Sequence, residues 1–111
     1  MELGLSGKAV VVTGGSRGIG LETARLFARE GARVLIAARR ESALAEGAAD
    51  ILASTGRAIA TYSMDVTDTS HIAALPEAIQ KTLGRVDILV NNAGTGTYKP
   101  FLEVTDEELM Y

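Results

Sequence analysis

A strand, a tight turn and a helix start are written in one continuous stretch near the N-terminus. The apolar run Ala9-Val10-Val11-Val12 leads into Thr13-Gly14-Gly15-Ser16-Arg17-Gly18-Ile19-Gly20, and an amphipathic segment follows at residues 21–30. Where a buried strand ends in such a turn, the unpaired N–H groups of the new helix point at the turn and attract an anion. The stretch therefore predicts a strand–turn–helix unit whose turn is a candidate phosphate site.

The three glycines of this turn have separate physical roles. Gly14 allows a sharp exit from the strand, Gly18 allows the backbone to approach a diphosphate, and Gly20 allows the helix to pack closely on the sheet. Their spacing differs from G-x-G-x-x-G, and no Gly-Lys-Ser/Thr follows that would make a Walker A loop. A structural turn without a ligand is the alternative, and the strand–turn–helix context favours the ligand.

The rest of the sequence alternates strand-like and helix-like segments. Apolar runs predict strands at residues 8–13, 33–38, 58–64 and 86–90. Helices are expected at 18–31, at 41–54 with Gly56 just beyond, and from Asp68, a good N-cap, towards residue 84. Pro76 is expected to kink the third helix or to split it. The capping box Thr105-Asp106-Glu107-Glu108 predicts the start of a fourth helix.

This alternation predicts repeated βαβ units and therefore a parallel sheet with right-handed crossovers. We expect an α/β fold of the Rossmann type with three layers (αβα), strand order 3-2-1-4, truncated to half of a doubly wound fold. The glycine turn ends the first strand, and Asn91-Asn92-Ala93-Gly94 ends the fourth. Both segments are expected to meet at the crevice where the strand order reverses.

Length, charge and composition exclude several classes of protein. The 111 residues allow one domain, and a formal net charge of −3 argues against a general nucleic-acid or membrane surface. The chain has no cysteine, so it has no disulfide and no thiolate metal site. No cluster of ligands at metal spacing accompanies His71, for which an exposed or capping role is expected. Without a secretory signal or a membrane-length apolar run, we expect a cytoplasmic location.

Two motifs together resemble the classical short-chain dehydrogenase/reductase family. They are Thr13-Gly14-x-x-x-Gly18-x-Gly20 and Asn91-Asn92-Ala93-Gly94, and Asp65-Val66 after the third strand matches a third family element. The resemblance covers residues 5–111. It implies that residues 1–111 form an NAD(P)-binding Rossmann domain, incomplete at the C-terminus. It also implies an oxidoreductase that transfers hydride between a nicotinamide cofactor and a carbonyl or alcohol.

The residues after the second strand indicate which cofactor is preferred. Folds that take NAD usually place an acid near the end of this strand, where it accepts from the ribose 2′-hydroxyl, and the matching position here is Ala38. Arg39 and Arg40 follow it, and Arg17 adds a third cation. Guanidinium groups bind a 2′-phosphate that an acid would repel, so we predict NADP in preference to NAD. The alternative is that Arg39 and Arg40 are solvated charges at a strand end.

Further cofactor contacts follow from the resemblance, position by position. The Ser16 hydroxyl and the Ile19 backbone are expected to face the phosphates. Asp65 is expected to accept from the adenine amine, with the Val66 backbone beside it, and a turn or cap role for Asp65 is the alternative.

The segment after the fourth strand is expected to lie under the ribose on the nicotinamide side. The residues that match the family there are Asn92, Ala93 and Gly94. Asn91 is expected instead to tie strand ends together through its amide, and Thr13 to form hydrogen bonds at the end of the first strand.

The family's catalytic groups have no counterpart in these 111 residues. The family uses a serine, an asparagine on the fourth helix, and a tyrosine with a lysine four residues later, which lowers the tyrosine pKa. Here Tyr62 is followed by Val66 at that spacing, Tyr98 by Leu102, and Tyr111 is the last residue. We therefore assign no catalytic residue and expect the 111-residue chain alone to be inactive.

Three interpretations stay open. The chain is the N-terminal part of an NADP-dependent oxidoreductase, or a dinucleotide-binding module without catalysis, or a half-domain that pairs with another chain through the apolar edge at residues 86–90. The expected partner of the intact protein is a small carbonyl or alcohol substrate, with no nucleic acid and no membrane, and the full-length protein is expected to form a homo-oligomer. The sequence specifies neither the substrate nor the direction of reaction, although NADP favours reduction.

Overall fold

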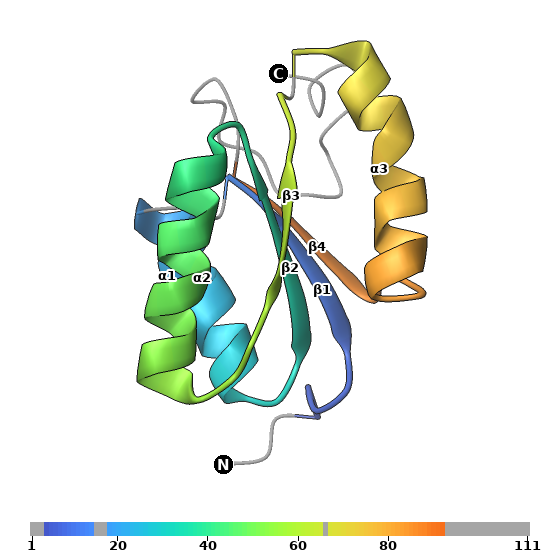
Figure 1. Ribbon diagram of the computed structural model, residues 1–111. Coiled ribbons are helices and arrows are strands. Elements are labelled where there is room, and N and C mark those ends of the chain that lie inside the picture. The colour runs from blue at the N-terminus through green and yellow to red at the C-terminus, as the bar shows by residue number, and fades with distance from the viewer. Residues whose placement is uncertain (1–3, 15–17, 66, 93–111) are drawn as a thin grey trace.

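A four-stranded parallel sheet with helices on both faces forms the fold (Figure 1). The computed structural model describes residues 4–14, 18–65 and 67–92. The strands lie in the order β3-β2-β1-β4, and each neighbouring pair is parallel. This confirms the α/β Rossmann-type architecture and the strand order predicted from the sequence. The elements in chain order are β1 Ala9–Thr13, α1 Gly18–Arg29, β2 Arg33–Ala38, α2 Glu41–Thr55, β3 Ala60–Ser63, α3 Thr69–Thr82 and β4 Ile88–Asn91.

The sheet separates two apolar cores, because alternate side chains of β1 and β2 point to opposite faces. Helices α1 and α2 cover one face and α3 the other (Figure 1). The first core gathers buried side chains of β1, β2, α1 and α2: Val10, Val12, Ala24, Ala28, Ala32, Val34, Ile36, Leu44 and Ile51. The second lies under α3: Ala9, Val11, Leu35, Ala37, Met64 and Leu83. Burial on both faces explains why residues 9–12 of β1 and 34–37 of β2 are all apolar.

The predicted helix boundaries are largely confirmed, and local chemistry explains each of them. Gly31 follows α1 with a φ of 91° and donates its N–H to the Ala28 carbonyl at 3.0 Å. Gly56 ends α2 in the left-handed conformation, with its N–H on the Leu52 carbonyl. Asp68 caps α3, since its side chain accepts from the Ser70 N–H at 2.9 Å.

Of the two outcomes predicted for Pro76, a kink or a split of the third helix, the split does not occur. Helix α3 runs without a break from Thr69 to Thr82 and contains Pro76 in its interior. Proline has no N–H to donate to the carbonyl of Ile72, which normally costs a helix stability. Ile72, Leu75 and Ile79 all pack against the second core, on both sides of the proline. We attribute the continuity of α3 to this packing, which outweighs the local penalty.

Two strands differ in extent from the prediction. Strand β3 covers only Ala60–Ser63, the four residues that pair with Leu35–Ala38 of β2. Strand β4 begins at Ile88 rather than at residue 86. The expected fourth helix at 105–108 and the loop before it lie outside the described residues.

Asp87 joins the start of β4 to the start of β1. Its N–H donates to the Ala9 carbonyl, and its Oδ2 accepts from the Ala9 N–H, both at 2.8 Å. The Arg85 Nε donates to the same oxygen at 3.0 Å. The Ala9 N–H, and after it Arg85, holds the pKa of Asp87 below its ordinary value of 3.8.

Asp87→Asn is expected to flatten the acid side of the stability profile. A carboxylate with a lower pKa in the folded state stabilises the fold above its unfolded pKa, and that contribution is lost as the pH falls through the folded value. Asparagine can still accept from the Ala9 N–H but cannot titrate. Thermal unfolding followed by circular dichroism, from neutral pH down to about pH 3, should therefore show a steeper fall in Tm for the wild type than for the variant.

Glu77→Gln is the matched control, because it removes an exposed carboxylate that pairs with Lys81 along α3, at 3.2 Å. It should leave the slope close to that of the wild type. Parallel Tm profiles for the wild type and Asp87→Asn would contradict the role given to Asp87.

Candidate functional site

The carboxyl ends of β1 and β4 are tied together by side chains. Thr13 pairs with Asn91 in the sheet register, and its Oγ1 donates to the Asn91 Oδ1 at 2.8 Å. The Asn92 N–H donates to the Thr13 carbonyl at 3.1 Å. Thr13 is buried, with 7% of its surface exposed. The structural roles expected of Thr13 and Asn91 are confirmed.

The glycine turn leaves β1 in a conformation that favours glycine. Gly14 has a φ of 71° and donates its N–H to the Ala37 carbonyl of β2 at 2.7 Å. Gly18, with a φ of 63°, is the first residue of α1. The conformational freedom expected of Gly14 is therefore used, and it directs the chain from β1 into α1. Gly15, Ser16 and Arg17 lie outside the described residues.

Helix α1 approaches the ends of β1 and β4 so closely that Gly20 has no room for a side chain. A Cβ atom at this position would overlap the Gly14 carbonyl oxygen and lie 2.8 Å from the Asn92 Nδ2. Gly20 itself is buried, whereas the Ile19 side chain beside it is 77% exposed. The packing role predicted for Gly20 is confirmed. It brings the N-terminus of α1 to the point where the strand order reverses.

The first turn of α1 suits an anion. The N–H groups of the first four residues of any α-helix have no partner within the helix, and they carry the positive end of the helix dipole. No acidic residue lies in the first turn of α1. A negatively charged group at this end would therefore meet hydrogen-bond donors and no competing carboxylate from that turn.

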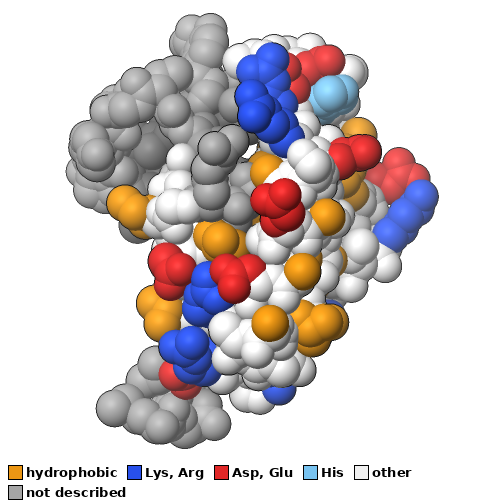
Figure 2. Space-filling view, turned by 60° about the vertical axis from the view of Figure 1, so that its left-hand side comes forward, with side chains coloured by type: hydrophobic (Ala, Val, Ile, Leu, Met, Phe, Trp, Pro, Cys, Tyr) orange, Lys and Arg blue, Asp and Glu red, His pale blue; other side chains and the backbone are white. Residues whose placement is uncertain are grey.

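The end of β2 supplies two exposed arginines with different backbone roles. Arg40 is the N-cap residue of α2, with an extended backbone whose carbonyl accepts from the Leu44 N–H at 3.0 Å. The Arg39 carbonyl accepts from the Ser63 Oγ of β3 at 3.2 Å, while its side chain is 79% exposed. Figure 2 shows basic, acidic and histidine side chains gathered at one end of the face that it presents.

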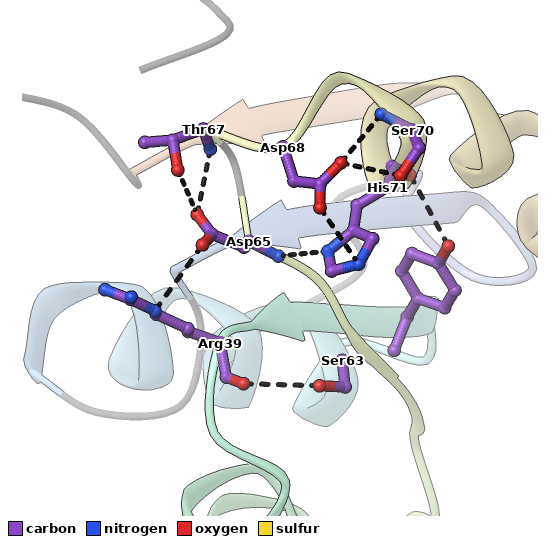
Figure 3. Close-up of polar contacts among 8 residues, drawn as sticks. Arg39, Ser63, Asp65, Thr67, Asp68, Ser70 and His71 are labelled. Atoms are coloured by element: carbon purple, nitrogen blue, oxygen red, sulfur yellow. Dashed lines mark hydrogen bonds and ion pairs between the residues drawn. The ribbon is translucent and has the colours of Figure 1, made fainter.

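Asp65 lies at the end of β3 and forms a turn. Its Oδ1 accepts from the Thr67 N–H at 2.9 Å and from the Thr67 Oγ1 at 2.7 Å. These two bonds are the main reason that the pKa of Asp65 lies below its ordinary value, with smaller contributions from Arg39 and His71. Its Oδ2 lies 3.7 Å from the Arg39 Nε (Figure 3). The turn role for Asp65 is thus observed, and Arg39 is brought beside it.

Two contacts at this end of the sheet were missed from the sequence. Ser63 supports the Arg39 backbone, and the His71 Nδ1 accepts from the Asp65 N–H at 3.0 Å (Figure 3). His71 is exposed, as expected, but it also reaches back from α3 to the end of β3. A histidine in the first turn of a helix that follows a short loop is the signal that could have indicated this contact. Val66, Ala93 and Gly94 lie outside the described residues.

Neither a metal centre nor a membrane-crossing helix is found in the ranges 4–14, 18–65 and 67–92. His, Asp and Glu side chains in these ranges do not form groups of three that could hold a metal ion. None of the helices in the same ranges combines the length and the apolar character that a bilayer crossing requires.

Known proteins resemble the chain over nearly its whole length. The family described as short chain dehydrogenase matches residues 8–111. Ketoacyl reductase HetN of Nostoc sp. is 43% identical over 90 residues, which are 81% of this chain and 31% of that protein. A reductase of Mycobacterium tuberculosis, named for (5R,7aS)-5-hydroxy-7a-methyl-1-oxo-2,3,5,6,7,7a-hexahydro-1H-indene-carboxyl-CoA, is 42% identical over 105 residues, 94% of this chain and 40% of that one.

Solved structures show the same likeness. L-sorbose reductase from Gluconobacter frateurii, in complex with NADPH and L-sorbose, is 39% identical and superposes with a TM-score of 0.80 over 99% of this chain and 42% of its own. The C-domain of a bacterial malonyl-CoA reductase with NADP gives 38% identity and a TM-score of 0.76 over 86% of this chain and 16% of its own. The chain thus spans less than half the length of each of these four proteins.

Gly20→Ala is expected to destabilise the protein by about 1–3 kcal/mol, the usual cost of forcing an extra methyl group into a closely packed site. The overlapped atom belongs to the backbone of Gly14, so relief requires α1 to move away from β1. Urea unfolding measures the change.

Gly18→Ala serves as the comparison. It places a methyl group where no atom lies within 4 Å, but on a backbone with positive φ, so it reports conformational strain alone. A variant Gly20→Ala as stable as the wild type would show that the close approach of α1 is not required.

Proposed function

Because the chain belongs to the short chain dehydrogenase family, whose members are oxidoreductases that bind nicotinamide cofactors, we propose that residues 1–111 form the NADP-binding part of such an enzyme. The enzyme transfers hydride between NADP(H) and a carbonyl or alcohol substrate, and the nicotinamide ring supplies that chemistry when the cofactor is bound. The observation that carries the proposal is the close approach of α1 to the ends of β1 and β4, where Gly20 has no room for a Cβ.

The described residues fit a dinucleotide diphosphate at this end of the sheet. Gly14 and Gly18 adopt positive φ values, and the N-terminus of α1 offers N–H donors without an acid in its first turn. The Ile19 backbone belongs to this first turn. We propose that the Ser16 hydroxyl and the Arg17 guanidinium complete the phosphate contacts.

The adenosine end of the cofactor is assigned to the ends of β2 and β3. Arg39 and Arg40 are exposed there, and in this proposal they bind the 2′-phosphate by charge-assisted hydrogen bonds. Asp65 and the backbone of Val66 receive the adenine amine. The solved complexes of L-sorbose reductase with NADPH and of the malonyl-CoA reductase domain with NADP support the choice of NADP.

The nicotinamide end is assigned to the segment that follows β4. The Asn92 amide lies next to Gly20, and with Ala93 and Gly94 it is proposed to lie under the ribose. The names of the relatives include L-sorbose, a ketoacyl compound and a CoA derivative. We therefore propose only a small carbonyl or alcohol as the substrate class, and a homo-oligomer for the whole protein.

Arg39→Ala is expected to weaken NADPH binding about tenfold to a hundredfold, the range for one hydrogen bond to a charged group. NADH has no 2′-phosphate, so its dissociation constant should change little. Isothermal titration with both reduced cofactors measures the difference. The wild type should bind NADPH more tightly than NADH.

Arg29→Ala is the matched control, because Arg29 is an exposed arginine in the last turn of α1, at the other end of that helix. It should leave both dissociation constants unchanged. Equal affinity of the wild type for the two cofactors would remove the NADP assignment, and no measurable binding of either would remove the proposed function itself.

A further inference from the structure

The imidazole of His71 connects the first turn of α3 to the end of β3. Its Nδ1 accepts from the Asp65 backbone N–H at 3.0 Å, and its Nε2 lies 3.5 Å from the Asp68 Oδ2 (Figure 3). A neutral imidazole has one acceptor nitrogen and one N–H donor. Because Nδ1 accepts here, the proton of the neutral ring belongs on Nε2, which faces the Asp68 carboxylate.

Asp65 is the first residue beyond the sheet hydrogen bonds of β3. The Met64 N–H still donates to the Ala38 carbonyl at 2.7 Å, and Met64 is buried in the second core. The Asp65 N–H is directed to His71 instead. The imidazole therefore holds the backbone at Asp65, where the chain leaves the sheet. The carboxylate of this residue faces Arg39.

The surrounding contacts hold the imidazole itself in place. Asp68, which faces Nε2, is the N-cap of α3 and accepts from the Ser70 N–H and Oγ. The Tyr62 hydroxyl of β3 lies 3.5 Å from the His71 carbonyl. His71 thus sits between two anchored elements, and its side chain is fixed relative to both.

We propose that His71 is a positioning residue for the adenine end of the cofactor site. By holding the Asp65 amide, the neutral imidazole keeps the Asp65 carboxylate in the orientation that the adenine amine requires. This inference rests on the proposed function, since the position of Asp65 matters to a ligand only if the protein binds a dinucleotide. Without this hydrogen bond, a smaller fraction of molecules has the binding-competent arrangement. The apparent dissociation constant rises in inverse proportion to that fraction.

Two substitutions separate positioning from a general structural role. His71→Leu removes the acceptor, whereas His71→Asn keeps an acceptor oxygen near the place of Nδ1. We expect the dissociation constants of NADPH and of 2′,5′-ADP, a probe of the adenosine end alone, to rise about threefold to tenfold in His71→Leu, the scale of one hydrogen bond. His71→Asn should restore most of the affinity. Gln80→Leu, an equally apolar change at an exposed position in the last turns of α3, should have no effect.

Amide hydrogen exchange at Asp65 reports the bond without any ligand. The exchange should be slow in the wild type and in His71→Asn and fast in His71→Leu. Unchanged 2′,5′-ADP affinity in His71→Leu, or a failure of asparagine to restore it, would overturn the proposal. If His71→Leu does not fold, two measurements on the wild type test the proposal instead. Fast exchange of the Asp65 amide would overturn it. So would a ¹⁵N chemical shift showing that the neutral His71 ring carries its proton on Nδ1.

Failure of the proposed function gives a different pattern. The wild type would then bind neither NADPH nor 2′,5′-ADP while its Asp65 amide stayed protected by His71. The positioning role would fall in that case because the site has no cofactor, although the hydrogen bond exists.

Discussion

The burial of β1 is the constraint on which the rest of the structure depends. All five residues of this strand are buried, so its peptide groups must be paired by neighbouring strands, and β2 and β4 run parallel to it on either side. Parallel pairing requires a long crossover between strands, which α1, α2 and α3 provide. All the strands then end at the same edge of the sheet. This is why Thr13 and Asn91, 78 positions apart in the sequence, meet there.

The position of α1 turns that edge into a site. A helix that packs at ordinary distance from a sheet leaves room for a side chain at each contact, but α1 lies so close to Gly14 and Asn92 that only a hydrogen atom fits at Gly20. The close approach brings the positive end of the helix dipole to the reversal point of the strand order. Fold and candidate function therefore depend on the same three residues, Gly14, Gly20 and Asn92. A substitution that moves α1 away from β1 also moves the N–H donors at the start of α1.

Features that are local or strongly apolar could be predicted from the sequence, and features that depend on tertiary contacts could not. Strand β2 has the predicted bounds of residues 33–38, because its apolar run is limited by Gly31 before it and by charged residues after it. Strand β3 is shorter than the predicted range 58–64, and its bounds are those of the four residues that pair with β2. Pro76 was expected to kink or split α3, and the split does not occur because packing against the second core overrides local preference. The bond between His71 and Asp65 depends on the path of the loop between them, which no periodicity in the sequence records.

In the proposed site, the two charged residues at the ends of β2 and β3 are held to different degrees. Asp65 is fixed through both its carboxylate, which accepts twice from Thr67, and its N–H. The Arg39 side chain is largely exposed, and its 3.7 Å approach to Asp65 is an exposed ion pair of small energy. Turning the guanidinium from Asp65 towards a phosphate therefore costs little. The fixed carboxylate of Asp65 suits the rigid edge of a purine. The long Arg39 side chain, on a backbone held by Ser63, suits a phosphate. The proposed roles of the two strand ends therefore follow from how firmly each residue is held.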